Sequence, residues 1–108
     1  MSFEEAINTV RNRFEDPNIK KSLSGFSKII RLDFPDKNIS YVMRIENGEL
    51  KEFEAKSVEN PDAVIVMDSE TFVGLINKKI SPVRAYMTGK IKVKGSASDL
   101  LKLRKVLF

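Results

Sequence analysis

The chain has 108 residues, and its 19 lysine and arginine residues against 15 aspartate and glutamate residues give a formal net charge of +4. This length predicts a single domain over residues 1–108 that is large enough to bury a hydrophobic core. Neither cysteine nor histidine occurs, which excludes disulfides, thiolate nucleophiles, Cys/His metal sites and imidazole base catalysis.

The N-terminal segment predicts helices. Ser2 and Glu5 stand at the spacing of a capping box, and the apolar residues that follow recur at helical intervals, which predicts a helix that stops near Asp16-Pro17. Residues 18–23 predict a short helix or a turn. The apolar face of the first helix needs a sheet to cover.

The middle of the chain predicts strands, because apolar and polar residues alternate there. Asn47-Gly48 predicts the tight turn of a hairpin. Residues 63–67 are continuously apolar, which is typical of a strand that is buried on both faces. We expect strands over residues 26–34, 39–46, 50–56 and 63–67.

Two short helices are expected next. The first begins at an Asp68 or Ser69 N-cap, and the second at Ser81-Pro82, where proline takes the first helical position. Gly89 ends the second helix and is expected to need either a positive φ or a close backbone contact.

The chain then predicts one more strand and a closing helix. Residues 90–94 alternate lysine with β-branched residues, which indicates a strand with one solvent-exposed face. Residues 96–108 predict a helix with an apolar stripe formed by Leu100, Leu103 and Leu107. Together these elements predict an α+β fold with a five-stranded, mainly antiparallel sheet that is covered by helices.

Residues 68–72 (DSETF) and 81–95 (SPVRAYMTGKIKVKG), followed by the Leu-Lys-Leu helix, resemble the sterol carrier protein (nonspecific lipid-transfer) domain family. The family pattern is a short helix ending in Ala-aromatic-hydrophobic-x-Gly-Lys, an alternating strand, a glycine and a closing amphipathic helix. The resemblance implies a lipid-binding or lipid-carrier protein. Its ligand would be a long-chain fatty acyl, isoprenoid or sterol-like molecule in an apolar tunnel between the helices and the sheet.

The predicted tunnel has an ordinary alternative. On the residues alone, a leucine stripe at helical spacing is more simply explained by a packed core, whereas the resemblance favours the tunnel, with the closing helix at its mouth. No cofactor, catalytic residue or metal ligand is expected. The residues expected to line the tunnel are Phe72, Leu75, Ile76, Ile80, Met87, Leu100, Leu103 and Leu107.

Nine of the nineteen cations lie within the last 31 residues. They would suit transient docking on an anionic membrane surface, or they would form the exposed face of an edge strand that Lys90, Lys92 and Lys94 protect from aggregation. We favour the second interpretation. Nucleic acid is not an expected partner, because these cations are not interleaved with stacking aromatic residues.

An enzyme is not expected, because the carboxylates are not paired on an apolar face and no nucleophile elbow or Walker-type loop occurs. The alternative to a carrier is a protein-interaction or accessory domain, whose apolar groove holds a homodimer mate or a partner's helix, or presents a substrate to an enzyme. A hydrolase acting on an acyl substrate is a third option. Since no apolar run reaches the roughly 18 residues of a membrane span and no signal-peptide core is present, we expect a cytoplasmic protein.

Overall fold

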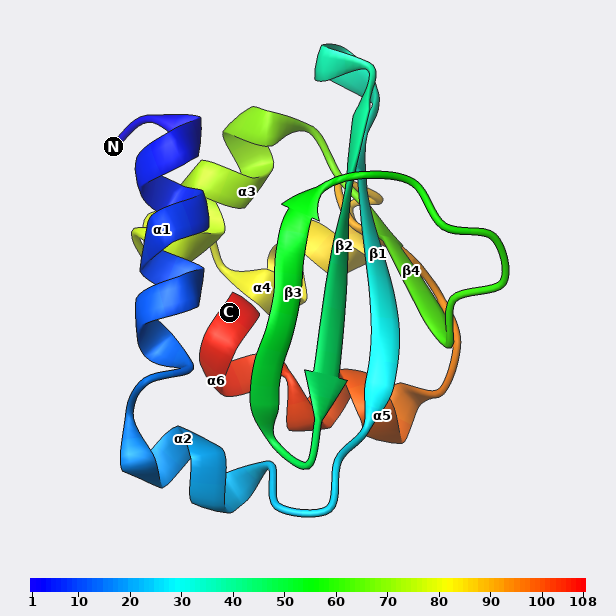
Figure 1. Ribbon diagram of the computed structural model, residues 1–108. Coiled ribbons are helices and arrows are strands. Elements are labelled where there is room, and N and C mark those ends of the chain that lie inside the picture. The colour runs from blue at the N-terminus through cyan, green and yellow to red at the C-terminus, as the bar shows by residue number, and fades with distance from the viewer.

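The computed structural model describes all 108 residues as a five-stranded sheet with helices packed against one face (Figure 1). In space the strands follow the order β3-β2-β1-β4-β5. The strands are β1 (Lys28–Phe34), β2 (Ile39–Glu46), β3 (Glu49–Ala55), β4 (Ala63–Val66) and β5 (Lys92–Lys94). The helices are α1 (Phe3–Arg13), α2 (Pro17–Ser22), α3 (Ser69–Ile76), α4 (Pro82–Met87), α5 (Ala97–Lys102) and α6 (Arg104–Leu107), and a short 3-10 helix, η1 (Pro35–Lys37), joins β1 to β2. The expected α+β class and the five strands are confirmed.

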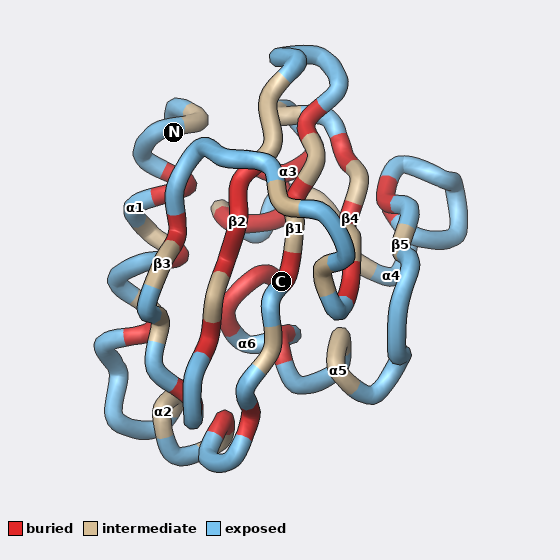
Figure 2. The backbone as a smooth tube through the Cα atoms, turned by 45° about the vertical axis from the view of Figure 1, so that its right-hand side comes forward, coloured by how far each residue is buried: buried red, intermediate tan, exposed pale blue.

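Three of the four strand pairs are antiparallel, as expected, but β1 and β4 run parallel, so the sheet is mixed. A parallel pair needs a crossover, and here the segment of residues 56–62 carries the chain across β2 and β1 before β4 begins (Figure 2). The guanidinium of Arg31 donates to the carbonyl oxygen of Val58 (3.0 Å) and holds this segment against the sheet. β5 pairs with β4 alone, and Lys92 and Lys94 are exposed on this edge.

The prediction that residues 63–67 are buried on both faces is wrong. Ala63, Ile65 and Met67 are buried, whereas Val64 and Val66 are only partly buried. The helices pack on the face of the sheet that carries Ala63, Ile65 and Met67. The other face is crossed by a connecting segment rather than covered by a helical layer, so its residues stay partly in solvent (Figure 1).

Aromatic rings fill the space between the sheet and the helices α1 and α3. Phe34 of β1 lies edge-on to Phe3 of α1, with ring centroids 4.9 Å apart, and to Phe72 of α3, with centroids 5.2 Å apart. Tyr41 of β2 lies in the same way between Phe3 and Phe53. Such pairs contribute about 0.5–1.5 kcal/mol each beyond the area that they bury. The rings therefore close this part of the interior.

The predicted turn and cap signals are confirmed where they depend on neighbouring residues. The Ser2 hydroxyl accepts from the backbone N–H of Glu5 (3.1 Å), and the Glu5 carboxylate accepts from the N–H of Ser2 (3.0 Å). Asn47 and Gly48 have φ values of 49° and 82°, as a tight hairpin turn requires. Gly89 has a φ of 77° and no heavy atom within 4 Å of the position of a Cβ, so conformation rather than crowding favours glycine there.

The N-terminus of α3 is capped from a distant part of the chain. Asp68 stands at the N-cap position, but its side chain makes no capping hydrogen bond. Instead, the carboxylate of Asp36 in η1 accepts from the hydroxyl of Ser69 and from its backbone N–H (2.8 Å). These bonds favour the charged carboxylate and lower the pKa of Asp36 from its ordinary value of 3.8.

Asp36→Asn is expected to lower the free energy of unfolding at neutral pH and to weaken its dependence on acid. Because the folded-state pKa of Asp36 is depressed, the stability that this group contributes is complete above pH 3.8 and is lost as the pH falls through the folded-state pKa. Urea denaturation of both proteins between pH 2 and 7 measures this. Glu59→Gln, an equal charge change in the exposed 56–62 segment, is the control, and an equal pH profile for Asp36→Asn and the wild type would contradict the proposed cap.

Candidate functional site

An apolar groove lies between α4 and the C-terminal segment formed by α5 and α6. Its volume is about 480 Å³, which is within the range of about 300–1,000 Å³ that small-molecule sites occupy. A smaller hollow adjoins it, and the two share Pro82, Val83, Tyr86 and Phe108. The residues that line the groove are Pro82, Val83, Tyr86, Val93, Gly95, Ala97, Leu100, Leu101, Arg104 and Phe108.

Exposed apolar side chains gather at the groove. Val83 (68% exposed), Tyr86 (63%) and Leu101 (69%) line it, and Met87 (78%) is the last residue of α4. These are four of the six large hydrophobic side chains that the protein exposes. Single exposed apolar side chains are common, but a cluster of them on two neighbouring helices is typical of an interaction surface or a ligand-binding groove.

The short helix α4 exposes Val83, Tyr86 and Met87 because only Ala85 is buried against the rest of the fold. The hydroxyl of Ser81 accepts from the N–H of Arg84 (3.3 Å) and starts the helix, with Pro82 at its first position. Ala85 is the only buried residue of α4, and its carbonyl oxygen accepts from the N–H groups of Lys90 and Ile91 after the helix ends. The small inward side chain leaves the larger ones outside.

The C-terminal segment packs its apolar side against the core. Leu103, Val106 and Leu107 are fully buried, and Figure 2 shows α6 behind the strands of the sheet. The prediction of one continuous helix over residues 96–108 is wrong, because the helix is interrupted at Leu103. There the N–H of Leu103 bonds to the carbonyl oxygen of Leu100 (3.1 Å), a tighter turn than that of an α-helix.

Arg13 ties the C-terminal segment to the rest of the fold. Its guanidinium donates to the carbonyl oxygen of Val106 in α6 (3.0 Å) and to that of Ile76 at the end of α3 (2.8 Å). Burial lowers the pKa of Arg13 from its ordinary value, although an arginine remains charged at neutral pH. One side chain of α1 thus satisfies the ends of two other helices.

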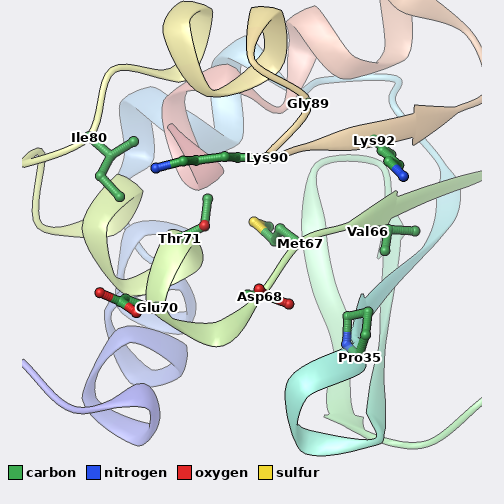
Figure 3. Close-up of a pocket in the computed structure, with 10 residues that line it drawn as sticks. All are labelled: Pro35, Val66, Met67, Asp68, Glu70, Thr71, Ile80, Gly89, Lys90 and Lys92. Carbon is green, nitrogen blue, oxygen red and sulfur yellow. The ribbon is translucent and has the colours of Figure 1, made fainter.

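A second cavity, of about 490 Å³, lies between α3 and the turn from α4 to β5 (Figure 3). Asp68 and Glu70 line it on the α3 side, and Lys90 and Lys92 on the opposite side. Thr71, only 8% exposed, also lines this cavity. Because charges of both signs border it, this cavity suits a polar group better than a hydrocarbon chain.

The eight residues that were expected to line a tunnel lie in four different places. Met87 is exposed at the end of α4, Leu100 lines the apolar groove, and Ile80 lines the charged cavity, where it packs on Gly74. The remaining five are buried in the core: Phe72, Leu75, Ile76, Leu103 and Leu107.

Sequence reasoning missed most of the groove. Val83, Tyr86 and Val93 belong to predicted elements but were not expected to line a site, and Leu101 and Phe108 lie outside the predicted stripe of Leu100, Leu103 and Leu107. One signal could have found two of them: in a six-residue helix whose small Ala85 faces inward, Val83 and Tyr86 face outward.

Comparison with known proteins gives one family match over most of the chain: the SCP-2 sterol transfer family, over residues 7–108. Hydroxysteroid dehydrogenase-like protein 2 of Xenopus tropicalis is 32% identical over 68 residues, which are 63% of this chain and 16% of that protein. The NMR structure of palmitated SCP2L2 from Aedes aegypti covers 99% of this chain and 95% of that one, with 20% identity and a TM-score of 0.77. The alkylsulfatase Pisa1 from Pseudomonas contains a similar fold within 14% of its chain, at a TM-score of 0.70 and 18% identity over 82% of this chain.

The chain therefore spans about a sixth of the first of these relatives. None of its helices combines the length and the apolar character that crossing a bilayer requires.

Arg13→Met is expected to lower the free energy of unfolding by about 1–3 kcal/mol, because two carbonyl oxygens lose a charged donor while the aliphatic packing is largely kept. Amide exchange over residues 103–108 should accelerate more than exchange in the sheet. Both can be followed by denaturation and by hydrogen exchange. Lys21→Met, which removes an exposed charge from α2, is the control, and unchanged exchange in the C-terminal segment of Arg13→Met would contradict the role of this contact.

Proposed function

We propose that this chain, which belongs to the SCP-2 sterol transfer family, binds a long-chain lipid with its hydrocarbon part in the apolar groove and acts as a lipid carrier. Membership of the family supports lipid binding or transfer in general. The ligand class, a fatty acyl, isoprenoid or sterol-like molecule, and its position in this chain are our proposal. The observation that carries the proposal is the groove between α4 and the C-terminal segment, with its exposed apolar rim.

The groove alone does not have to hold the whole ligand. Leu103 and Leu107 are buried on the same C-terminal segment that carries Leu100 and Phe108, two residues of the groove lining. An outward shift of α5 and α6 would admit a chain between them and the expected lining residues of α3, Phe72, Leu75 and Ile76. Ile80, which precedes α4, and Met87, its last residue, would then lie at the two ends of this helix.

Such a shift is within reach of the energies involved. α5 and α6 have six and four residues, too few to be stable as isolated helices, so their order depends on packing and on Arg13. A ligand that replaces the lost apolar contacts offsets much of the cost of moving them.

The magnitudes suit transport better than storage. About ten buried methylenes contribute roughly 8 kcal/mol relative to water, which corresponds to a dissociation constant near 1 µM before ordering costs. A bilayer offers hydrocarbon a similar gain. Exchange between membrane and protein is then nearly balanced, as release requires.

Arg104 would add a preference for an acidic headgroup. It lines the groove and takes part in none of the six ion pairs of the protein. A fatty acid could therefore place its carboxylate against this guanidinium while its chain follows the apolar lining.

An accessory role is the second candidate. The matched region makes up only 16% of the first relative above, so a related domain occurs there within a longer protein. In such a role the groove would hold a partner's helix or a second copy, or would present a lipid to an enzyme.

A long-chain fluorescent fatty acid is expected to bind the protein at one site with a low-micromolar dissociation constant. Leu100→Asn should weaken this binding about tenfold or more, because it places an amide against hydrocarbon. Ile29→Asn, at an exposed apolar position of β1 outside the groove, should bind like the wild type. Fluorescence titration measures all three proteins, with thermal melting as the check that each is folded.

The absence of saturable binding in a monodisperse sample would contradict the carrier proposal. Equal binding by Leu100→Asn and the wild type would reject the groove as the site. Mass spectrometry of an organic extract of the purified protein would identify a lipid that co-purifies.

A further inference from the structure

Charge is distributed very unevenly along the chain. Residues 78–108 hold nine cations and one carboxylate, whereas residues 1–77 hold ten cations and fourteen carboxylates. The single carboxylate, Asp99, faces Lys28 at 3.7 Å. None of the nine cations takes part in an ion pair. The part of the protein that contains the groove is therefore strongly positive, and the remainder is negative.

Some of these cations gather beside α4. Lys79, Arg84 and Lys90 border a cavity of about 390 Å³, together with the hydroxyl residues Ser81 and Thr88. This cavity lies along the opposite side of α4 from the apolar groove, since Arg84 and Ala85 border the first, and Val83 and Tyr86 the second. Across the groove from α4, the C-terminal segment carries three exposed cations: Arg104 lines the groove, and Lys102 and Lys105 belong to the same segment.

The exposed apolar residues lie between these two groups of cations. Val83, Tyr86 and Met87 belong to α4, and Leu101 belongs to α5. We call these four apolar side chains and the six cations beside them the α4 surface. The cations are Lys79, Arg84 and Lys90 on one side, and Lys102, Arg104 and Lys105 on the other. Apolar side chains that can enter the acyl region, flanked by cations that meet phosphate groups, match the layered chemistry of a membrane surface.

We propose that the α4 surface docks on membranes that contain anionic lipids, with Val83, Tyr86 and Met87 inserted between the headgroups. This goes beyond lipid binding in the groove, because it assigns a separate contact with a bilayer and a charge preference. Docked in this way, the protein would open the groove toward the bilayer, since Val83 and Tyr86 belong to both surfaces. A lipid could then pass from one to the other with little exposure to water.

Charge complementarity favours an anionic membrane over a second copy of the chain. In a dimer formed through two α4 surfaces, the cations of one copy would repel the cations of the other. A bilayer of anionic lipids instead supplies the missing negative charge.

The inference can be tested by sedimenting the protein with vesicles at low salt. Binding to vesicles of equal parts phosphatidylcholine and phosphatidylglycerol is expected, with little binding to phosphatidylcholine alone and progressive release as salt is added. Arg84→Gln should weaken the binding about fivefold, because each cation near an anionic surface strengthens binding by a factor of about that size. Lys21→Gln, which also removes one positive charge but from α2, should not change the binding.

The apolar part of the contact needs its own variants. Val83→Ser and Tyr86→Ser should each weaken vesicle binding about tenfold, because the side chain no longer gains from leaving water. Both positions are more than 60% exposed, so the fold should survive, and thermal melting checks this. Ile29→Ser, at an exposed apolar position away from α4, is the matched control.

Three results would overturn the inference: no binding to anionic vesicles, equal binding to neutral and anionic vesicles, or equal loss in Lys21→Gln and Arg84→Gln. A dimer that Val83→Ser dissociates, in a protein that does not bind vesicles, would assign the surface to self-association and would also overturn it. Fatty-acid binding without vesicle binding would reject docking and leave the proposed function standing. Vesicle binding without fatty-acid binding would reject the proposed function alone.

Discussion

The two hydrogen bonds of Arg13 connect the parts of this protein that sequence separates most widely. They join α1 to the end of α3 and to α6, so the N-terminal helix, the helix over the sheet and the C-terminal segment share one charged donor group. Arg13 is partly buried, and removing it would leave carbonyl oxygens at two helix ends without that donor. The position of α5 and α6, and with it the shape of the apolar groove, depends on this contact and on the burial of Leu103, Val106 and Leu107.

The interior is divided into a closed part and an open part. Between α1, α3 and the sheet, rings in edge-to-face contact fill the space and leave little room for a ligand. Around α4 the opposite holds, since one alanine anchors the helix and its larger apolar side chains face outward. In the proposed function, a ligand would have the packed aromatic layer on one side and the short helices around α4 on the other.

Local rules predicted the features that depend on a few adjacent residues. The capping box at Ser2, the turn at Asn47-Gly48 and the positive φ of Gly89 each follow from residue type and spacing. The patterns of the separate elements predicted the α+β fold with five strands, which the structure has. The resemblance carried by residues 68–72 and 81–95 predicted the family, and the family match over residues 7–108 confirms it.

Contacts between distant residues were beyond such rules. The cap of α3 comes from Asp36, which precedes Ser69 by 33 positions, and no residue near Asp68 indicates this contact. The parallel pairing of β1 with β4 follows from the path of a connecting segment, and the break at Leu103 from the fit of the last residues to the core. For the site, hydrophobic periodicity identified five residues that are buried in the core, but it could not separate a packed core from a lining, and it also included the exposed Met87.

The position of a bound acyl chain tests the central claim most directly. Isotope-filtered NOE spectra of the labelled protein with unlabelled palmitate would measure it. The account predicts contacts between the ligand methylenes and the methyl groups of Val83, Leu100 and Leu103. Contacts confined to the charged cavity around Asp68 and Lys90, or a complex in which the α4 and C-terminal methyl groups show none, would contradict it.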